Sequence, residues 1–201
     1  MTRRILIIHS PTAGKRRTAL LDGVVAALRA RGLAPEVVTT EGPGHATDLA
    51  LSADADLVVA AGGDGTINEV VHGLMTRDGP RPAFATLPLG TINVLALELG
   101  LPRYAGDKVV PPDARLTAHD LHVLIGLRHG RWNLMRYGAA YMRGVLPSLP
   151  DLRIVPVHRL GIAAPAGKPV QLDGDNRLTT PVDIEVVDEP LMVASVSPMN
   201  G

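Results

Sequence analysis

A glycine-rich run that follows a short apolar stretch has the composition of a phosphate-binding loop. It reads Ala61-Gly62-Gly63-Asp64-Gly65-Thr66-Ile67-Asn68-Glu69. Glycines carry no Cβ, so backbone N–H groups can approach phosphate oxygens, and a helix that begins at such a loop points its positive end at them. A carboxylate at Asp64 would repel phosphate unless it handles Mg²⁺, a ribose hydroxyl or a proton. The alternative is structural, with Asp64 and Thr66 capping the helix in a tight turn.

Two common nucleotide-binding patterns do not fit the chain. The dinucleotide pattern G-x-G-x-x-G fails because Asn68 stands in place of the third glycine. The P-loop pattern fails because Gly14-Lys15 is followed by Arg16 and has no glycine five positions earlier. The residues of the glycine-rich run expected to bind phosphates are Gly62, Gly63, Asp64, Gly65, Thr66, Ile67 and Asn68.

Two further loops offer the same kinds of group. One follows the first expected strand at residues 10–14, and the other follows the fourth at residues 88–93. Each supplies a glycine, hydroxyl groups and the start of a helix, so we expect the three loops to meet on one polyphosphate. The nucleotide site predicted from them also includes Ser10, Pro11, Thr12, Ala13, Gly14, Gly90, Thr91 and Asn93.

The elements that must position these loops alternate in the first hundred residues. Strands are expected at Ile5 to His9, Glu36 to Thr40, Leu57 to Ala61 and Phe84 to Leu87. Apolar residues with helical spacing lie between or after them, at residues 21–28, 67–74 and 92–99, and a shorter helix is expected at residues 44–52. This alternation predicts an α/β fold, a doubly wound parallel sheet whose loops gather at its carboxyl edge.

The second part of the chain has a different texture. Strand-like runs occur at residues 121–127, 152–157, 161–164, 182–187 and 191–195, and only Trp132 to Val145 has the pattern of a helix. We therefore predict two domains, an α/β domain at residues 1–105 and a smaller, mainly β domain at residues 114–201.

Composition excludes several classes of function. The 201 residues carry 20 Lys and Arg against 20 Asp and Glu, and no Cys, so neither a long-range field nor thiol chemistry is expected. Aromatic residues make up only 2%, which leaves little material for stacking on nucleic acid bases, so nucleic acid is not an expected partner. The apolar run at residues 5–8 is too short for a signal peptide, and no stretch approaches the roughly 18 residues that span a bilayer. A cytoplasmic location is expected.

Several motifs together resemble one group of kinases. The run Gly62 to Thr66 is shared by three groups that resemble one another here: lipid kinases of the diacylglycerol and sphingosine kinase superfamily, NAD kinases and phosphofructokinases. Residues 88–102, PLGTINVLALELGLP, resemble the bacterial lipid kinase pattern Pro-x-Gly-Thr-x-Asn followed by a short helix. Residues 40–46 resemble the family's Thr-containing loop before the second helix, and residues 171–175 resemble its C-terminal Leu-Asp-Gly-Glu motif.

The resemblance implies an ATP- and Mg²⁺-dependent kinase that phosphorylates the hydroxyl of a diacylglycerol-like or sphingoid-like lipid at the inner membrane surface. It implies that Thr40 contacts ATP, that residues 63–68 hold the phosphates, and that Asp173 or Asp175 takes the proton from the hydroxyl. Phosphoryl transfer needs positioning, Mg²⁺ and one base, which agrees with this set. From the residues alone, Asp173-Gly174-Asp175 favours an ordinary hairpin turn.

The chain also departs from the family pattern. Ser10 stands where the family usually has Asn, and Asp175 stands where it has Glu. A block of strands that follows the Gly-Thr-x-Asn helix in relatives, and contributes there to the lipid-binding β domain and a structural Mg²⁺ site, is absent. Two other hypotheses therefore stand beside the lipid kinase: a non-catalytic nucleotide-binding relative that has lost its acceptor site, and an NAD kinase.

Membrane and self-association are the remaining expectations. The helix predicted at Trp132 to Val145 carries Arg136 and Arg143 beside aromatic and Met residues, so it either meets anionic lipid or packs on a sheet. An edge exposed by the missing strands favours pairing of two chains, which predicts a homodimer.

Overall fold

The computed structural model describes residues 3–12, 18–90, 119–172 and 175–194, and the side chains of residues 172–177 are not part of that description. The chain divides into two compact units, Met1–Gly106 with Pro190–Gly201, and Asp107–Glu189. Each unit is described by itself. The helix expected at residues 92–99 lies outside the described residues.

The first unit is built on a four-stranded parallel sheet with the order β2-β1-β3-β4. Its strands are β1 (Ile5–His9), β2 (Glu36–Thr39), β3 (Leu57–Gly62) and β4 (Ala83–Pro88). All four expected strands are confirmed to within one residue at each end. The inner strands read as apolar runs because both of their faces are covered.

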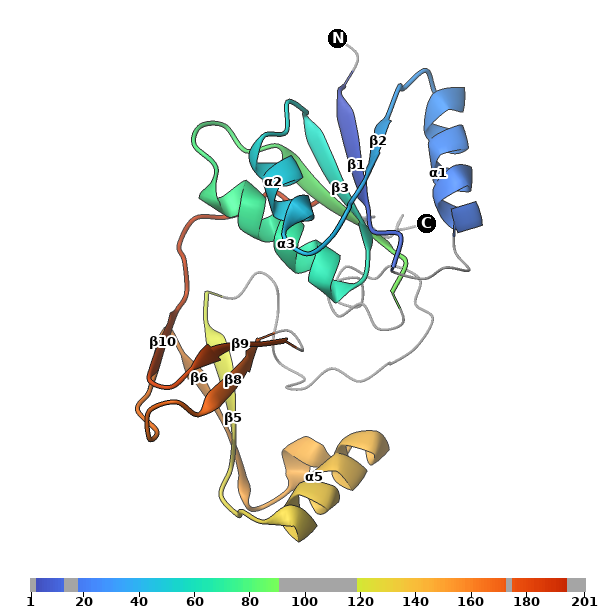
Figure 1. Cartoon of the computed structure of the whole chain (residues 1–201). Coiled ribbons are helices and arrows are strands. Elements are labelled where there is room, and N and C mark those ends of the chain that lie inside the picture. Colours follow the sequence, from blue (N-terminus) through green and yellow to red (C-terminus); the bar gives the residue numbers. More distant parts are fainter. Residues whose placement is uncertain (1–2, 13–17, 91–118, 173–174, 195–201) are drawn as a thin grey trace. The chain divides into compact units, whose positions relative to one another are not determined.

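Helices cover both faces of this sheet (Figure 1). Helix α1 (Thr18–Ala30) packs Leu21 and Val25 on one face, against Ile5 and Ile7. Helices α2 (His45–Leu51) and α3 (Asp64–Thr76) pack on the other face, where they share a core with Leu6 and Ile8 of β1. Neighbouring residues of a strand point to opposite faces, so β1 contributes to both cores. The predicted α/β fold class is confirmed.

Helices α2 and α3 approach closely at Gly73. A Cβ at Gly73 would lie 2.4 Å from the carbonyl oxygen of Thr47 and 2.8 Å from the Cβ of Ala50. Real Cβ atoms do not come this close, so only glycine allows the two backbones to meet here. The contact fixes α2 against α3, and α2 is the helix that follows the loop after β2.

The C-terminal segment returns to the first unit. The N–H of Phe84 donates to the carbonyl oxygen of Met192 (2.7 Å), and the N–H of Ala194 donates to that of Phe84 (2.7 Å), which makes a parallel bridge at the outer edge of β4. The sequence predicts a strand at residues 191–195 as part of the second domain, whereas residues 190–194 group with the first unit. The composition of a segment can indicate a strand, but it does not indicate which sheet edge the strand joins.

The second unit consists of strand pairs and one longer helix. The pairs are β5 (Leu121–Gly126) with β6 (Leu152–Val157), β7 (Arg159–Ile162) with β10 (Val182–Glu185), and β8 (Pro169–Leu172) with β9 (Asp175–Thr179), all antiparallel. Helix α5 (Arg131–Arg143), the 3-10 helix η1 (Leu146–Ser148) and β6 supply its small core, in which Ala140, Leu146 and Leu152 are buried together. The second unit consists mainly of β-strands, as expected from the sequence.

Candidate functional site

The loops that follow the four parallel strands are tied together at the carboxyl edge of the sheet. The N–H of Ser10 donates to the carbonyl oxygen of Ala61 (3.0 Å), and the N–H of Thr40 donates to that of His9 (2.8 Å). The N–H of Leu89 donates to the carbonyl oxygen of Gly62 (2.9 Å). Parallel strands end on one edge, so groups far apart in the sequence meet there, as the sequence predicted.

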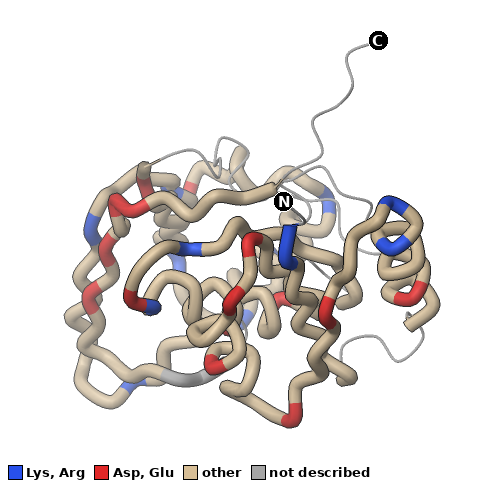
Figure 2. Tube along the Cα trace, turned by 90° about the horizontal axis from the view of Figure 1, so that it is seen from above, with Lys and Arg blue, Asp and Glu red and all other residues tan. Residues whose placement is uncertain are grey.

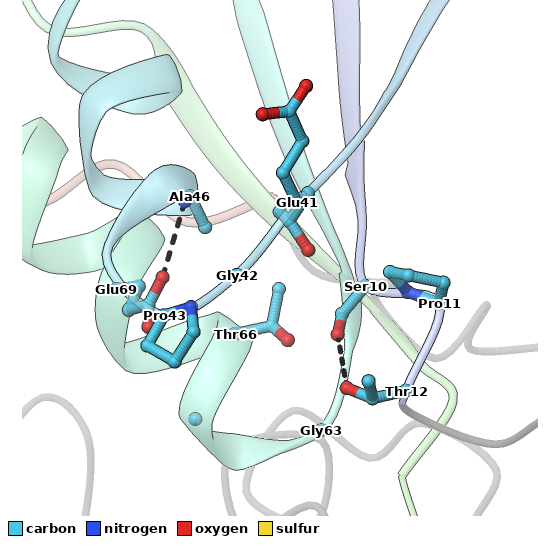
Figure 3. Close-up of a pocket in the computed structure, with 12 residues that line it drawn as sticks. Ser10, Pro11, Thr12, Glu41, Gly42, Pro43, Ala46, Gly63, Thr66 and Glu69 are labelled. Atoms are coloured by element: carbon cyan, nitrogen blue, oxygen red, sulfur yellow. Dashed lines mark hydrogen bonds between the residues drawn. The ribbon is translucent and has the colours of Figure 1, made fainter.

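A cavity of about 390 Å³ opens between three of these loops (Figure 3). Its size lies within the usual range for small-molecule sites. Its lining consists of Ser10, Pro11, Thr12, Thr40, Glu41, Gly42, Pro43, Ala46, Gly63, Gly65, Thr66 and Glu69. The cavity therefore combines hydroxyl groups, glycines and the first turn of α3.

The first turn of α3 is shaped by its glycines. The N-cap of α3 is Gly63, which makes no side-chain cap hydrogen bond, and Asp64 and Thr66 follow it as the first and third residues of the helix. A Cβ at Gly62 would lie 2.3 Å from the Oγ1 of Thr66, so glycine alone lets that hydroxyl fold back onto the strand end. Nothing lies within 4 Å of the Cβ position of Gly65, which borders the cavity. The helix begins with its N–H groups turned to this space.

Glu69 holds the loop after β2 in place. Its Oε1 accepts from the N–H of Gly44 (2.9 Å), and its Oε2 accepts from the N–H of Ala46 (3.2 Å). The Oγ1 of Thr47 donates to the carbonyl oxygen of Glu69 (3.0 Å). A carboxylate from α3 thus satisfies the unpaired N–H groups at the start of α2 and stabilises its positive end.

His9 lies at the end of β1, directly before the site. Burial lowers the pKa of His9 below 6.5, and the charge of Asp22 opposes that shift. The next residue, Ser10, is buried, and its Oγ lies 3.0 Å from the Oγ1 of Thr12. A neutral imidazole next to paired hydroxyls gives this corner of the site no positive charge of its own.

The cavity brings together seven of the residues predicted from the sequence: Ser10, Pro11, Thr12, Thr40, Gly63, Gly65 and Thr66. Four others adjoin the site without lining the cavity, namely Gly62, Asp64, Asn68 and Gly90. Ile67 is buried in the core, and its N–H donates to the carbonyl oxygen of Gly63 (3.1 Å), so it seats α3.

The structure describes no side chain for the remaining predicted residues. Ala13, Gly14, Thr91, Asn93 and Asp173 lie outside the described residues. Asp175 begins β9, where it pairs with Leu172, but its side chain is not described. Strands β8 and β9 pair up to Leu172 and Asp175, and the choice between a plain turn and a catalytic base at Asp173 or Asp175 stays a prediction.

Five lining positions were not among the predicted site residues: Glu41, Gly42, Pro43, Ala46 and Glu69. The signal for the first four was the loop of residues 40–46, which contains them. Ala46 and Glu69 are brought together by the packing of α2 on α3, and the residue spacing between them gives no sign of it. Acidic and basic residues both occur along the described trace (Figure 2). The distribution of charge therefore does not mark the site, which is defined by the residues that line the cavity.

Comparison with known proteins agrees with this geometry. The Diacylglycerol kinase catalytic domain family matches residues 4–121. A diacylglycerol kinase of Staphylococcus epidermidis is 36% identical over 137 residues, which cover 66% of this chain and 42% of the relative. One of Staphylococcus haemolyticus is 37% identical over 132 residues, covering 63% and 38%. The crystal structure of a diacylglycerol kinase from Bacillus anthracis matches with a TM-score of 0.43 and 29% identity over 50% of this chain and 37% of that one.

The fold and the site together define a parallel α/β domain with a small-molecule cavity at the carboxyl edge of its sheet. The chain belongs to the diacylglycerol kinase catalytic domain family, because that family matches more than half of it. It spans only about two fifths of the length of the curated relatives that it matches.

Proposed function

We propose that the protein transfers the γ-phosphoryl group of ATP to the hydroxyl of a diacylglycerol-like or sphingoid-like lipid. The observation that carries the proposal is the cavity of about 390 Å³ at the first turn of α3, walled by glycines and hydroxyl groups. Membership of the family and the diacylglycerol kinases among its relatives support the same reaction. In this reaction the lipid oxygen bonds to the γ-phosphorus, the bond to the bridging oxygen breaks, and ADP leaves.

The cavity residues would bind the nucleotide by groups that carry no net charge. Gly63 and Gly65 leave room for phosphate oxygens next to the N–H groups that begin α3. Thr66, Ser10 and Thr12 add hydroxyl donors on the same side of the cavity (Figure 3). Thr40 borders the cavity from the loop after β2 and is the proposed contact to ATP.

Mg²⁺ fits this arrangement as a partner of the nucleotide. In the described ranges, no three His, Asp or Glu side chains gather to hold a metal ion. Mg²⁺ is commonly held by one or two carboxylates together with substrate phosphates, so a full protein cage is not needed. Asp64, the first residue of α3, would hold it, and the ion would neutralise charge on the phosphate oxygens.

The proton of the lipid hydroxyl needs an acceptor. We assign it to Asp173 or Asp175, in the hairpin segment between β8 and β9. Asp175 is one methylene shorter than the Glu of the family pattern, so proton transfer at this residue depends on a closer approach of the hydroxyl.

The proposal extends to location and assembly. A lipid acceptor places the protein at the cytoplasmic face of a membrane, as a peripheral protein. Pairing of two chains is proposed through the edge that the missing strands leave exposed. The mass of the protein in solution tests this part, and a monomer at micromolar concentration would contradict it.

The test is transfer of label from γ-³²P-ATP to diacylglycerol and sphingosine in mixed micelles with Mg²⁺. We expect label in the organic phase with the unaltered chain and none with Asp64→Asn. Asp78→Asn is the matched control, because it removes the same charge at the exposed far end beyond α3 and should keep the rate.

Two other outcomes would replace the proposal. Saturable ATP binding without any lipid product would favour a non-catalytic nucleotide-binding relative, in keeping with the share of the relatives that the chain covers. Label recovered on NAD instead of lipid would favour an NAD kinase.

A further inference from the structure

Helix α5 has a packed face and a bare face. Ala140 is buried against Leu146 and Leu152, and Tyr137 packs at the rim of the same cluster. The other apolar side chains of α5 point to solvent: Trp132 and Leu134 are each 72% exposed, and Met142 is 70% exposed. Leu134, Met135 and Met142 fall on one side of a helix with 3.6 residues per turn, opposite Ala140. Monomeric proteins rarely leave such a stripe without a partner.

Exposed apolar residues also occur at the end of the strand that precedes the helix. Leu124, Ile125 and Leu127, in and directly after β5, are exposed. We call the exposed apolar side chains of α5, namely Trp132, Leu134, Met135 and Met142, the α5 face.

The stretch of chain that carries α5 is mostly positive. Between Leu121 and Lys168 the chain carries seven Lys and Arg and a single acid, Asp151. Asp151 is buried, accepts from the hydroxyl of Tyr137 (2.8 Å) and from Arg136, and lies 3.7 Å from the Nε of Arg128. The Tyr137 hydrogen bond, aided by Arg136, holds the pKa of Asp151 below its ordinary range. The one acid of residues 121–168 is thus bonded to side chains of the same stretch.

Two of the other cations, Arg131 and Arg143, stand at the ends of the helix. Arg131 lies over the ring of Trp132, with its Cζ 5.9 Å from the ring centroid, and Arg143 ends the helix. The first turn of α5 contains no acid, so the positive end of the helix dipole adds to these charges. Exposed Leu and Met flanked by Trp and Arg are the composition of helices that lie in a membrane interface.

We propose that the α5 face docks on the surface of an anionic lipid bilayer, with α5 lying parallel to it. The Leu, Met and Trp side chains enter the boundary of headgroups and acyl chains, and Arg131 and Arg143 meet lipid phosphates. No helix in the described part of the chain is long and apolar enough to cross a bilayer, which agrees with a helix that lies on it. The inference rests on the proposed function in one respect: the proposed function supplies the reason for docking, which is access to a lipid acceptor.

A second copy of the chain fits the same surface less well. Two α5 faces in a symmetric pair would bring arginine against arginine, either each with its own copy or Arg131 with Arg143, and α5 itself carries no acid to match them. An anionic membrane satisfies both the apolar and the charged parts of the surface.

The experiment uses the only tryptophan of the chain, Trp132, as a reporter. The protein is mixed, without ATP, with sucrose-loaded vesicles of phosphatidylcholine alone or of equal parts phosphatidylcholine and phosphatidylglycerol. We expect a blue shift of the emission and sedimentation with the anionic vesicles only, and loss of both at high salt. An unchanged emission, or equal sedimentation with both kinds of vesicle, would overturn the proposal.

Two pairs of variants locate the surface. Met142→Ser should weaken binding about tenfold, because it removes an apolar side chain that would be buried in lipid. Met192→Ser is its matched control, equally exposed at 73% but in the first unit, and should bind as before. Arg131→Gln with Arg143→Gln should weaken binding about fivefold per arginine, whereas Arg29→Gln with Arg31→Gln on and after α1 should not.

Failure of docking and failure of the proposed function remain distinguishable. Vesicle binding is measured without nucleotide, and label transfer is measured with acceptor in detergent micelles, where Met142→Ser should keep the rate of the unaltered chain. Equal losses for Met142→Ser and Met192→Ser would overturn the docking surface. So would a doubled mass without vesicles together with emission already shifted to the blue, since the α5 face would then be an interface between copies.

Discussion

Replacing Glu69 by Gln tests whether the wall of the cavity is held by this side chain. The carboxylate accepts from two N–H groups at the start of α2, over 2.9 and 3.2 Å. Gln keeps one acceptor oxygen and turns an NH₂ group toward the other donor, so one bond is lost along with the charge at the positive end of α2. Because both bonds are partly open to solvent, we expect a cost of about 1–2 kcal/mol. For a chain of this size that lowers the melting temperature by roughly 2–8 °C.

The binding assay separates positioning from electrostatics. Glu69→Gln removes a negative charge near the phosphates, which by itself would strengthen ATP binding. If the bonds to Gly44 and Ala46 hold the loop, affinity should instead fall, by up to about tenfold for 1.4 kcal/mol. Calorimetric titration with ATP measures this, and hydrogen exchange at the amides of Gly44 and Ala46 should become faster.

Glu41→Gln is the matched control. Glu41 also lines the cavity, is exposed, and directs its carboxylate away from the hydroxyls of Ser10, Thr12 and Thr66 (Figure 3). Its replacement should leave affinity unchanged or slightly raised. If Glu69→Gln raises affinity in the same way, the carboxylate does not position the loop and the reasoning fails.

Three further predictions concern the same edge of the sheet. Gly62→Ala should destabilise the fold by about 1–3 kcal/mol in urea denaturation, because its Cβ would lie 2.3 Å from the Oγ1 of Thr66. Adding Thr66→Gly removes that contact and should recover part of the loss. If the losses of the two substitutions simply add, no clash is present. Gly65→Ala should gain up to about 1 kcal/mol of helix stability, since nothing lies within 4 Å of its Cβ, yet weaken ATP binding by filling the cavity wall; unaltered ATP affinity would show that phosphate does not sit there. Burial lowers the pKa of His9, so the unfolded chain binds more protons there than the folded one as pH falls below 6.5. Stability should therefore be complete above pH 6.5 and decline as the pH falls below it, and His9→Gln should decline less over the same range in urea titrations.

Most of the first unit could be predicted because its pattern has few alternatives. The apolar run of β1 and the i, i+3, i+4, i+7 stripe of α1 each fit one element and one face, and the parallel topology then gathers the loops at one edge. That is why Ser10 and Gly63 were placed together although they lie far apart in the chain, whereas Thr40 was added by the family resemblance.

The parts that could not be predicted depend on packing between elements. The bonds from Gly44 and Ala46 to Glu69 span 25 and 23 residues, and they exist because Gly73 lets α2 and α3 approach. The amino-acid sequence gives no sign of how closely α2 and α3 approach. The segment around Val193 shows the same limit, since its composition indicates a strand but the edge of β4 that it joins is decided by tertiary structure.

Helix α5 shows how two interpretations of one pattern can both describe a helix. The sequence offered packing on a sheet or contact with anionic lipid as alternatives. In the structure Ala140 and Tyr137 take the first role, which uses small and amphipathic side chains on one side. The large apolar residues Leu134, Met135 and Met142 are left on the other side, with exposed Trp132 at its flank, and packing within the unit does not account for them. The distribution of side-chain size around the helix, rather than the number of apolar residues in it, is therefore what argues for a bilayer on the exposed side.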